Sequence, residues 1–122
     1  MDEKNKILFK LLKSLNLPVY ENVYQGEDKD IENPFILFNL ETDKVDFSAF
    51  DTPIAFLVSY QIHLYCPLEF NYHNVVKQIR RILFENGFSY PSIDNILLDK
   101  TNAELTVENL RHIVLSTEIN YN

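Results

Sequence analysis

The residues best suited to metal or nucleophilic chemistry are one cysteine and two nearby histidines, spaced as His63-x-x-Cys66 with His73 seven residues further on. Thiolate and imidazole groups at such spacing are typical of zinc sites. His63 and Cys66 are expected on one strand, however, where an offset of three residues places them on opposite faces. His112 is the remaining histidine that could complete a ligand set. The spacing therefore favours a small, buried, apolar Cys66 over a metal site or a cysteine–histidine nucleophile.

Glycine is too scarce for the common phosphate-binding and nucleophile motifs. The chain has two glycines, so it cannot form a Gly-rich phosphate loop, and it contains no G-x-S-x-G nucleophile elbow. The many carboxylates fall beside turn-forming residues, which is typical of a solvated surface. We therefore expect no catalytic residue, no metal and no cofactor, and an enzyme is the least favoured class. Turnover that disappears when His63 or His112 is changed would reverse that expectation.

Lys77, Arg80 and Arg81 form the one compact basic patch of the sequence. The patch is either a solvated helix face or a surface that forms ion pairs with acidic segments of a neighbouring copy. The acidic residues that could supply such partners are Glu27, Asp28, Asp30, Asp43, Asp46 and Asp51. We expect an interface with another subunit or with a partner protein at the basic patch and at Asp43, Asp46 and Asp51. Charge complementarity of this kind fixes register more than it adds affinity.

The overall composition is that of one acidic globular domain covering residues 1–122. Eleven basic and eighteen acidic residues give a formal net charge of −7, which disfavours binding to a phosphate backbone. The single cysteine excludes an internal disulfide framework and fits a reducing compartment. The first residues lack the pattern of a secretory signal, and no apolar run approaches the roughly 20 residues that span a bilayer. We expect a cytosolic protein without a membrane partner.

Two segments have the apolar periodicity of amphipathic helices. In residues 2–15 the leucine and isoleucine side chains recur at helical spacing, and Pro18 lies just beyond. Residues 72–86 repeat their apolar side chains at 3–4 spacing, with Asn71 as a plausible N-cap and Gly87 just past the C-terminus. The basic patch lies off the apolar stripe of this second helix and is therefore expected at the surface.

The clearest strand is residues 54–66, where apolar side chains occupy every even position. Such a period of two indicates one face on a core and the other toward solvent or a partner. Further strands are predicted at residues 18–24, 35–41, 88–98 and 110–121. The acidic residues 42–53 are predicted to be a mobile or functional loop. The order α-β-β-β-α-β-β predicts a two-layer α+β domain, with two helices on one face of a largely antiparallel or mixed sheet of four or five strands.

Three segments, in this order and spacing, resemble a known family. They are NPFILFNL, then LVSYQIHLYC after the acidic segment, then the helix VVKQIRRILFENGFSY. The chain thereby resembles small phage tail-completion proteins, the tail-terminator or tail-to-head joining proteins of long-tailed phages and Firmicute prophages. The resemblance covers about residues 34–90, and RHIVLSTEI near the C-terminus matches more loosely. His63 departs from the pattern, because a small or acidic residue is expected there.

The resemblance implies a structural virion protein without an active site. Proteins of this family form a ring, commonly a hexamer, on the end of the tail tube, stop its polymerisation and join it to the head connector. The implied partners are the tail tube protein, a head-completion or connector protein and further copies of the chain. The implied location is the tail–head junction of the virion, and the bacterial cytoplasm during assembly.

Two other classes of function remain open. One is a different component of the virion neck, since head-closure and other minor tail or capsid proteins share small α+β folds. The other is an acidic adaptor or immunity-type module that binds and neutralises a basic protein. A tight one-to-one complex in place of a ring would identify this second alternative.

Overall fold

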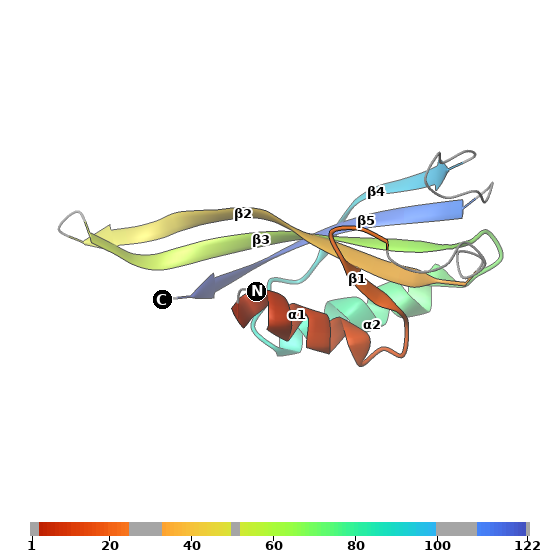
Figure 1. Ribbon diagram of the computed structural model, residues 1–122, viewed down its shortest axis with the longest axis horizontal. Coiled ribbons are helices and arrows are strands. Elements are labelled where there is room, and N and C mark those ends of the chain that lie inside the picture. The colour runs from red at the N-terminus through yellow and green to blue at the C-terminus, as the bar shows by residue number, and fades with distance from the viewer. Residues whose placement is uncertain (1–2, 25–32, 50–51, 100–109, 122) are drawn as a thin grey trace.

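The computed structural model describes residues 3–24, 33–49, 52–99 and 110–121. In chain order the elements are α1 (Glu3–Lys13), β1 (Val19–Glu21), β2 (Phe35–Ala49), β3 (Thr52–Pro67), α2 (Tyr72–Glu85), β4 (Ser92–Asp99) and β5 (Leu110–Tyr121). This is the predicted order α-β-β-β-α-β-β. Both helices pack against one face of the sheet and leave the other face free of helices (Figure 1). The predicted two-layer α+β fold is therefore confirmed.

The strands form one mixed sheet in the order β1-β2-β3-β5-β4. The short strand β1 runs parallel to β2 and pairs only with Ile36, Leu37 and Phe38, whereas the other neighbouring strands are antiparallel. The strands β2 and β3 form a long hairpin that extends beyond the helices (Figure 1). The edge strands among the described residues are therefore β1 and β4, and much of β2 has no neighbour on the side away from β3.

Alternation along β3 builds the centre of the core. The side chains of Val58, Tyr60, Ile62, Leu64 and Cys66 are all fully buried beneath the helices. The residues between them point to the helix-free face of the sheet, as the sequence pattern predicts for a strand with one face on a core. The expected alternation of β5 is also present, with its buried residues at Ile113, Leu115, Thr117 and Ile119.

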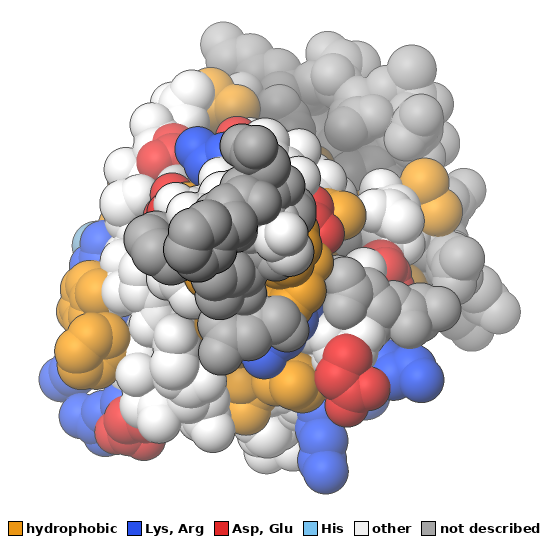
Figure 2. All heavy atoms as spheres, turned by 90° about the vertical axis from the view of Figure 1, so that its left-hand side faces the viewer, with side chains coloured by type: hydrophobic (Ala, Val, Ile, Leu, Met, Phe, Trp, Pro, Cys, Tyr) orange, Lys and Arg blue, Asp and Glu red, His pale blue; other side chains and the backbone are white. Residues whose placement is uncertain are grey.

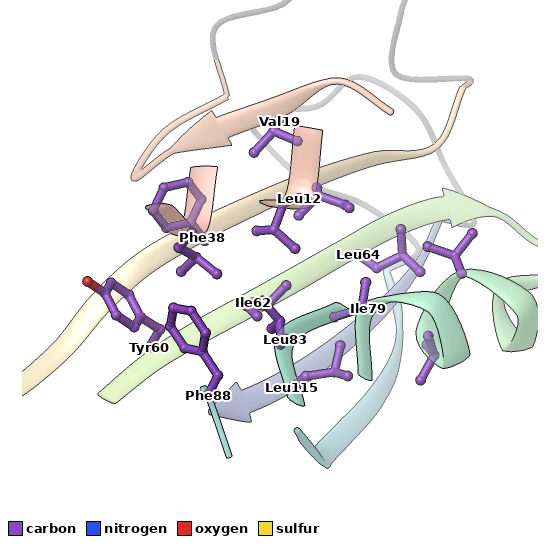
Figure 3. Packing of buried hydrophobic residues seen from close by; sticks show 14 of the residues in the cluster. Leu12, Val19, Phe38, Tyr60, Ile62, Leu64, Ile79, Leu83, Phe88 and Leu115 are labelled. Atoms are coloured by element: carbon purple, nitrogen blue, oxygen red, sulfur yellow. The ribbon is translucent and has the colours of Figure 1, made fainter. Parts of the chain in front are cut away.

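The two helices cover this face with their apolar stripes. Leu8 and Leu12 of α1 and Ile79 and Leu83 of α2 are fully buried. Figure 3 shows Leu12, Ile79 and Leu83 in one cluster with buried side chains of β2 and β3, among them Phe38, Ile62 and Leu64. Burying each such side chain contributes about 1.5–3 kcal/mol, so this shared core fixes both helices against the sheet.

Helix α2 ends in a Schellman motif at the predicted glycine. Gly87 has φ +91°, a conformation that glycine adopts readily. The N–H of Phe88 donates to the carbonyl of Leu83 over 3.0 Å, and the N–H of Gly87 donates to the carbonyl of Phe84. Phe88 and Leu83 are also packed in the same core cluster. This motif stops the helix and directs the chain toward β4.

A polar network joins α1 to the sheet. The buried hydroxyl of Tyr60 donates a hydrogen bond to Oδ1 of Asn5, and Nδ2 of Asn5 donates to Oε1 of Glu21 over 2.9 Å. Three elements, α1, β1 and β3, are connected in this way. Because a buried hydroxyl or amide without a partner is costly, the network restricts how α1 can sit on the sheet.

The prediction of a loop at residues 42–53 is wrong. Strand β2 continues through Ala49 and β3 begins at Thr52, so all but residues 50–51 of this segment lie in strands, and those two are outside the described residues. The pairing register shifts after Leu40, Val45 and Phe47. The first two shifts insert an extra residue in β2, Glu41 and Asp46, and the third inserts one in β3, Ile54. Each bulge reverses which face the following side chain of its strand points to, so the sequence loses its period of two although the hydrogen-bonded ladder continues. The fourth strand is also shorter than expected and begins at Ser92.

Candidate functional site

The cysteine and histidines considered for metal binding lie apart. Cys66 is fully buried on the core face of β3, whereas His63 is on the opposite, helix-free face, as predicted from their offset of three. His73 is exposed on α2 and stacks on Tyr72 with ring centroids 4.2 Å apart. Burial raises the pKa of the Cys66 thiol to about 11, which keeps it protonated and unreactive. Within the described ranges, no three His, Cys, Asp or Glu side chains gather as metal ligands would.

The sequence did not reveal that His63 meets His112 on the helix-free face. Nδ1 of His63 lies 2.7 Å from Nε2 of His112, and Nε2 of His63 lies 3.1 Å from Oδ1 of Asn39. Because an amide oxygen only accepts, Nε2 of His63 carries the proton and its Nδ1 accepts from His112. Desolvation by burial, and then the charge of His112, lower the pKa of His63 to about 4. His63 is therefore neutral near pH 7.

Aromatic rings continue from this pair to one end of the helix-free face. Tyr65 stacks on His112 with centroids 4.1 Å apart and on Phe35 with centroids 5.0 Å apart. Tyr20 and Tyr24 pack edge-on or tilted against the same group. These stacked rings fill the space beside the strands, so the face is ordered without a covering helix.

The predicted acidic residues Asp43 and Asp46 lie on the distal part of β2. We call this part the arm, defined as residues 42–49 of β2 and the β3 residues 52–59 that they pair with. The hydroxyl of Tyr121 donates to Oδ2 of Asp43 over 2.9 Å, and Nδ2 of Asn120 donates to Oδ2 of Asp46 over 2.9 Å. Both carboxylates are exposed and keep further acceptor positions. The third predicted acidic residue, Asp51, lies outside the described residues, as do Glu27, Asp28 and Asp30.

The three predicted basic residues differ in what they contact. Arg80 is half-buried, and its Nε donates a hydrogen bond to the backbone carbonyl of Pro91 over 3.0 Å. Its guanidinium also lies 5.2 Å from the centroid of the Tyr90 ring. Arg80 therefore ties α2 to the segment that leads into β4. Lys77 and Arg81 are exposed, and no carboxylate of the described residues forms an ion pair with either.

Lys77 and Arg81 border a shallow hollow on the surface of α2. The hollow has a volume of about 220 Å³ and is also lined by Phe84, Glu85 and Tyr90. Phe84 and Tyr90 are 61% and 58% exposed, with their ring centroids 6.0 Å apart. Figure 2, in which the tip of the hairpin faces the viewer, shows exposed hydrophobic side chains beside lysine and arginine side chains at this end of the molecule. Exposed aromatic rings beside arginine are typical of protein-binding surfaces.

The edge strand β4 is unusually apolar for its position. Its exposed large aliphatic side chains are Ile93, Ile96, Leu97 and Leu98, each 36–49% exposed. An edge strand offers unpaired backbone N–H and C=O groups, and soluble proteins commonly protect such an edge with lysine or proline. The residues Ser92–Asp99 contain neither. The sequence indicated only a weak strand here, because the position at a sheet edge is decided by the fold.

The structure therefore ties α2 to the segment that leads into β4, and keeps the basic face of α2 apart from the acidic arm. The hydrogen bond from Arg80 to Pro91 connects α2 to the start of β4. No ion pair among the residues described links Asp43 or Asp46 to the basic patch. We define the candidate binding surface as β4 together with Lys77, Arg81, Phe84 and Tyr90.

Comparison with models of protein families gives no match for this chain, and comparison with curated proteins gives no significant match either. No helix among the described residues is long and apolar enough to cross a membrane. The function proposed for the chain therefore rests on its own residues and surfaces.

Proposed function

We propose that this chain is a structural assembly protein of the tail-completion type, which binds other copies of itself and the end of a phage tail tube. The observation that carries the proposal is the exposed apolar edge of β4, and the basic and aromatic face of α2 adds a second exposed surface. An exposed strand edge with large apolar side chains favours pairing with another protein chain. The order of sequence patterns from residue 34 to residue 90 supports the choice of the tail-completion family.

The side chains available for chemistry support a binding role over an enzymatic one. Cys66 is buried with a raised pKa, and His63, whose pKa is lowered to about 4, contacts His112, on which Tyr65 stacks. Neither faces the hollow on α2, which is lined by Lys77, Arg81 and aromatic rings. A binding surface needs shape, apolar area and charge, and the candidate surface offers a hollow, exposed apolar side chains and the cations Lys77 and Arg81.

Electron microscopy of the purified protein tests the proposal, both alone and mixed with the tail tube protein encoded in the same genome. We expect rings with a central opening, or caps on tube ends that stop the growth of the tube. A matched sample with Leu98→Lys, which places a charge on the β4 edge, should lose both. A protein that stays monomeric and leaves the tube length unchanged would refute the proposal and favour the acidic adaptor class.

A further inference from the structure

Two histidine side chains meet on the face of the sheet that the helices leave open (Figure 1). His63 on β3 and His112 on β5 are diagonal neighbours, since His63 pairs with Val114 and His112 pairs with Tyr65. Nδ1 of His63 and Nε2 of His112 lie 2.7 Å apart, and both side chains are only partly buried. Imidazole nitrogen is a preferred ligand of zinc, copper and nickel ions. Two such donors therefore converge at a point that solvent ions can reach.

This pair is a different set of donors from the one that sequence spacing suggested. That set combined His63 with Cys66 and His73, but Cys66 is buried in the core and His73 lies on α2. The pairing of β3 with β5 instead supplies His112, which is 49 positions from His63 in the sequence. Among the described residues no third His, Cys, Asp or Glu joins the two histidines. Any ion bound by this pair therefore keeps coordination positions for water.

A second contact holds each of the two rings. Nε2 of His63 lies 3.1 Å from Oδ1 of Asn39, so this nitrogen carries the proton and donates it to the amide oxygen. The ring of His112 stacks on Tyr65, with centroids 4.1 Å apart. A metal-binding histidine almost always donates its other N–H to an oxygen, which fixes its tautomer and its orientation. Asn39 therefore directs the lone pair of Nδ1 of His63 toward His112.

The separation of the two nitrogens is close to that of a chelating pair. Two nitrogens bound to one ion at about 2.0–2.1 Å lie about 2.9 Å apart at a right angle and about 3.4 Å apart at the tetrahedral angle. The observed 2.7 Å is nearer to the right-angled value, which Cu²⁺ and Ni²⁺ adopt in square-planar or tetragonal sites. Binding replaces the direct hydrogen bond between the rings. His112 then carries its proton on Nδ1, and each ring turns so that both lone pairs point to the ion.

The side chains around the pair place no positive charge beside it. Arg111 is next to His112 in the sequence but lies on the other face of the sheet, where its guanidinium is 5.0 Å from the ring centroid of Tyr72 on α2. A cation can therefore approach the two nitrogens without repulsion from a described neighbour. The residues level with the two histidines on adjacent strands are all uncharged, namely Leu37, Tyr65, Leu97 and Val114.

We propose that His63 and His112 bind one divalent ion of a late first-row transition metal, with Cu²⁺ held most tightly and water in the remaining positions. The order of affinity follows from the general preference of nitrogen donors, in which Cu²⁺ exceeds Ni²⁺ and Zn²⁺. Asn39 is a positioning residue, since it orients His63 without touching the ion. The proposal is independent of the assembly function, because neither histidine belongs to the candidate binding surface.

Calorimetric titration of the purified chain with CuCl₂, NiCl₂, ZnCl₂ and MgCl₂ tests the proposal. We expect Cu²⁺ to bind most tightly at this site, Ni²⁺ and Zn²⁺ to bind more weakly, and Mg²⁺, which requires oxygen ligands, not to bind there. His63→Gln and His112→Phe should each weaken Cu²⁺ binding by at least about tenfold, since each removes one of the two ligands. The phenylalanine keeps a ring against Tyr65. His73→Gln is the matched control and should bind Cu²⁺ like the wild type.

Electron paramagnetic resonance of the chain with one equivalent of CuCl₂ identifies the ligands directly. The wild-type spectrum should show coupling to two nitrogen donors, and either histidine variant should lose one of them. Asn39→Leu should weaken Cu²⁺ binding about tenfold, because His63 then loses the acceptor that orients it. Asn39→Asp should retain the binding, since a carboxylate oxygen also accepts from Nε2 of His63.

Two results would overturn the proposal. One is Cu²⁺ affinity that stays unchanged in both His63→Gln and His112→Phe. The other is a wild-type spectrum without two nitrogen donors, and this result requires no variant to fold. Thermal unfolding of each variant near the wild-type midpoint shows that a loss of binding comes from the missing ligand. Ring or cap formation in electron microscopy is unaffected by these outcomes, so the proposed function is judged separately.

Discussion

His63, which contacts His112, should make the stability of the protein depend on pH in a way that can be traced to one side chain. The pKa of His63 is about 4 in the folded chain and near 6.5 when unfolded. Between these values the unfolded chain binds a proton that the folded chain does not bind. The contribution of His63 is therefore fully present above about pH 6.5 and is lost as the pH falls toward 4.

The size of this effect follows from the geometry around the ring. A proton added at Nδ1 of His63 would face Nε2–H of His112 across 2.7 Å, so the folded state must break or rearrange that hydrogen bond. The full difference in pKa corresponds to roughly 3 kcal/mol. Because the His63 ring is only half-buried and water screens part of the charge, we expect a loss of about 1–2 kcal/mol.

Urea unfolding of the wild-type chain and of His63→Gln at about pH 7.5 and about pH 4.5 measures this loss. Carboxylates also titrate over this range, so the quantity of interest is the difference between the two proteins. His63→Gln should lose about 1–2 kcal/mol less than the wild type between the two pH values. His73→Gln, at an exposed position of α2, is the matched control and should follow the wild type. Identical pH dependence in His63→Gln and the wild type would refute the reasoning.

Three further predictions concern the core. Tyr60→Phe should lower the free energy of unfolding by about 1–3 kcal/mol, because it leaves Oδ1 of Asn5 without its donor; an unchanged urea midpoint would contradict the role of this hydrogen bond. Leu83→Ala should lower the free energy of unfolding by about 2–5 kcal/mol in the same assay, since the Leu83 side chain is fully buried. Phe84→Ala, at the next residue, should lower it by less than about 1 kcal/mol, because Phe84 is 61% exposed. Similar losses in the two variants would argue against the orientation of α2. Cys66 should react with a thiol reagent only after unfolding, and rapid labelling of the native protein would show that it is not buried.

The local elements followed from side-chain periodicity in the sequence. The helical spacing of apolar residues located α1 and α2 to within a few residues, and Gly87 marked the end of α2 because glycine adopts positive φ readily. Alternation over residues 54–66 located β3 and assigned Cys66 to the core. These properties depend on which face of one element each side chain occupies, and that is encoded in neighbouring residues.

Tertiary structure alone decided how these elements meet. The arm was missed because two bulges in β2 and one in β3 break the alternation, while the ladder between the two strands of the hairpin continues. The pairing of β5 with β3 brought His112 beside His63, from 49 positions away in the sequence. Sheet order placed β4 at an edge, so its leucines and isoleucines are exposed where a central strand would bury them. Pairing between distant strands depends on the whole core, and no local pattern contains it.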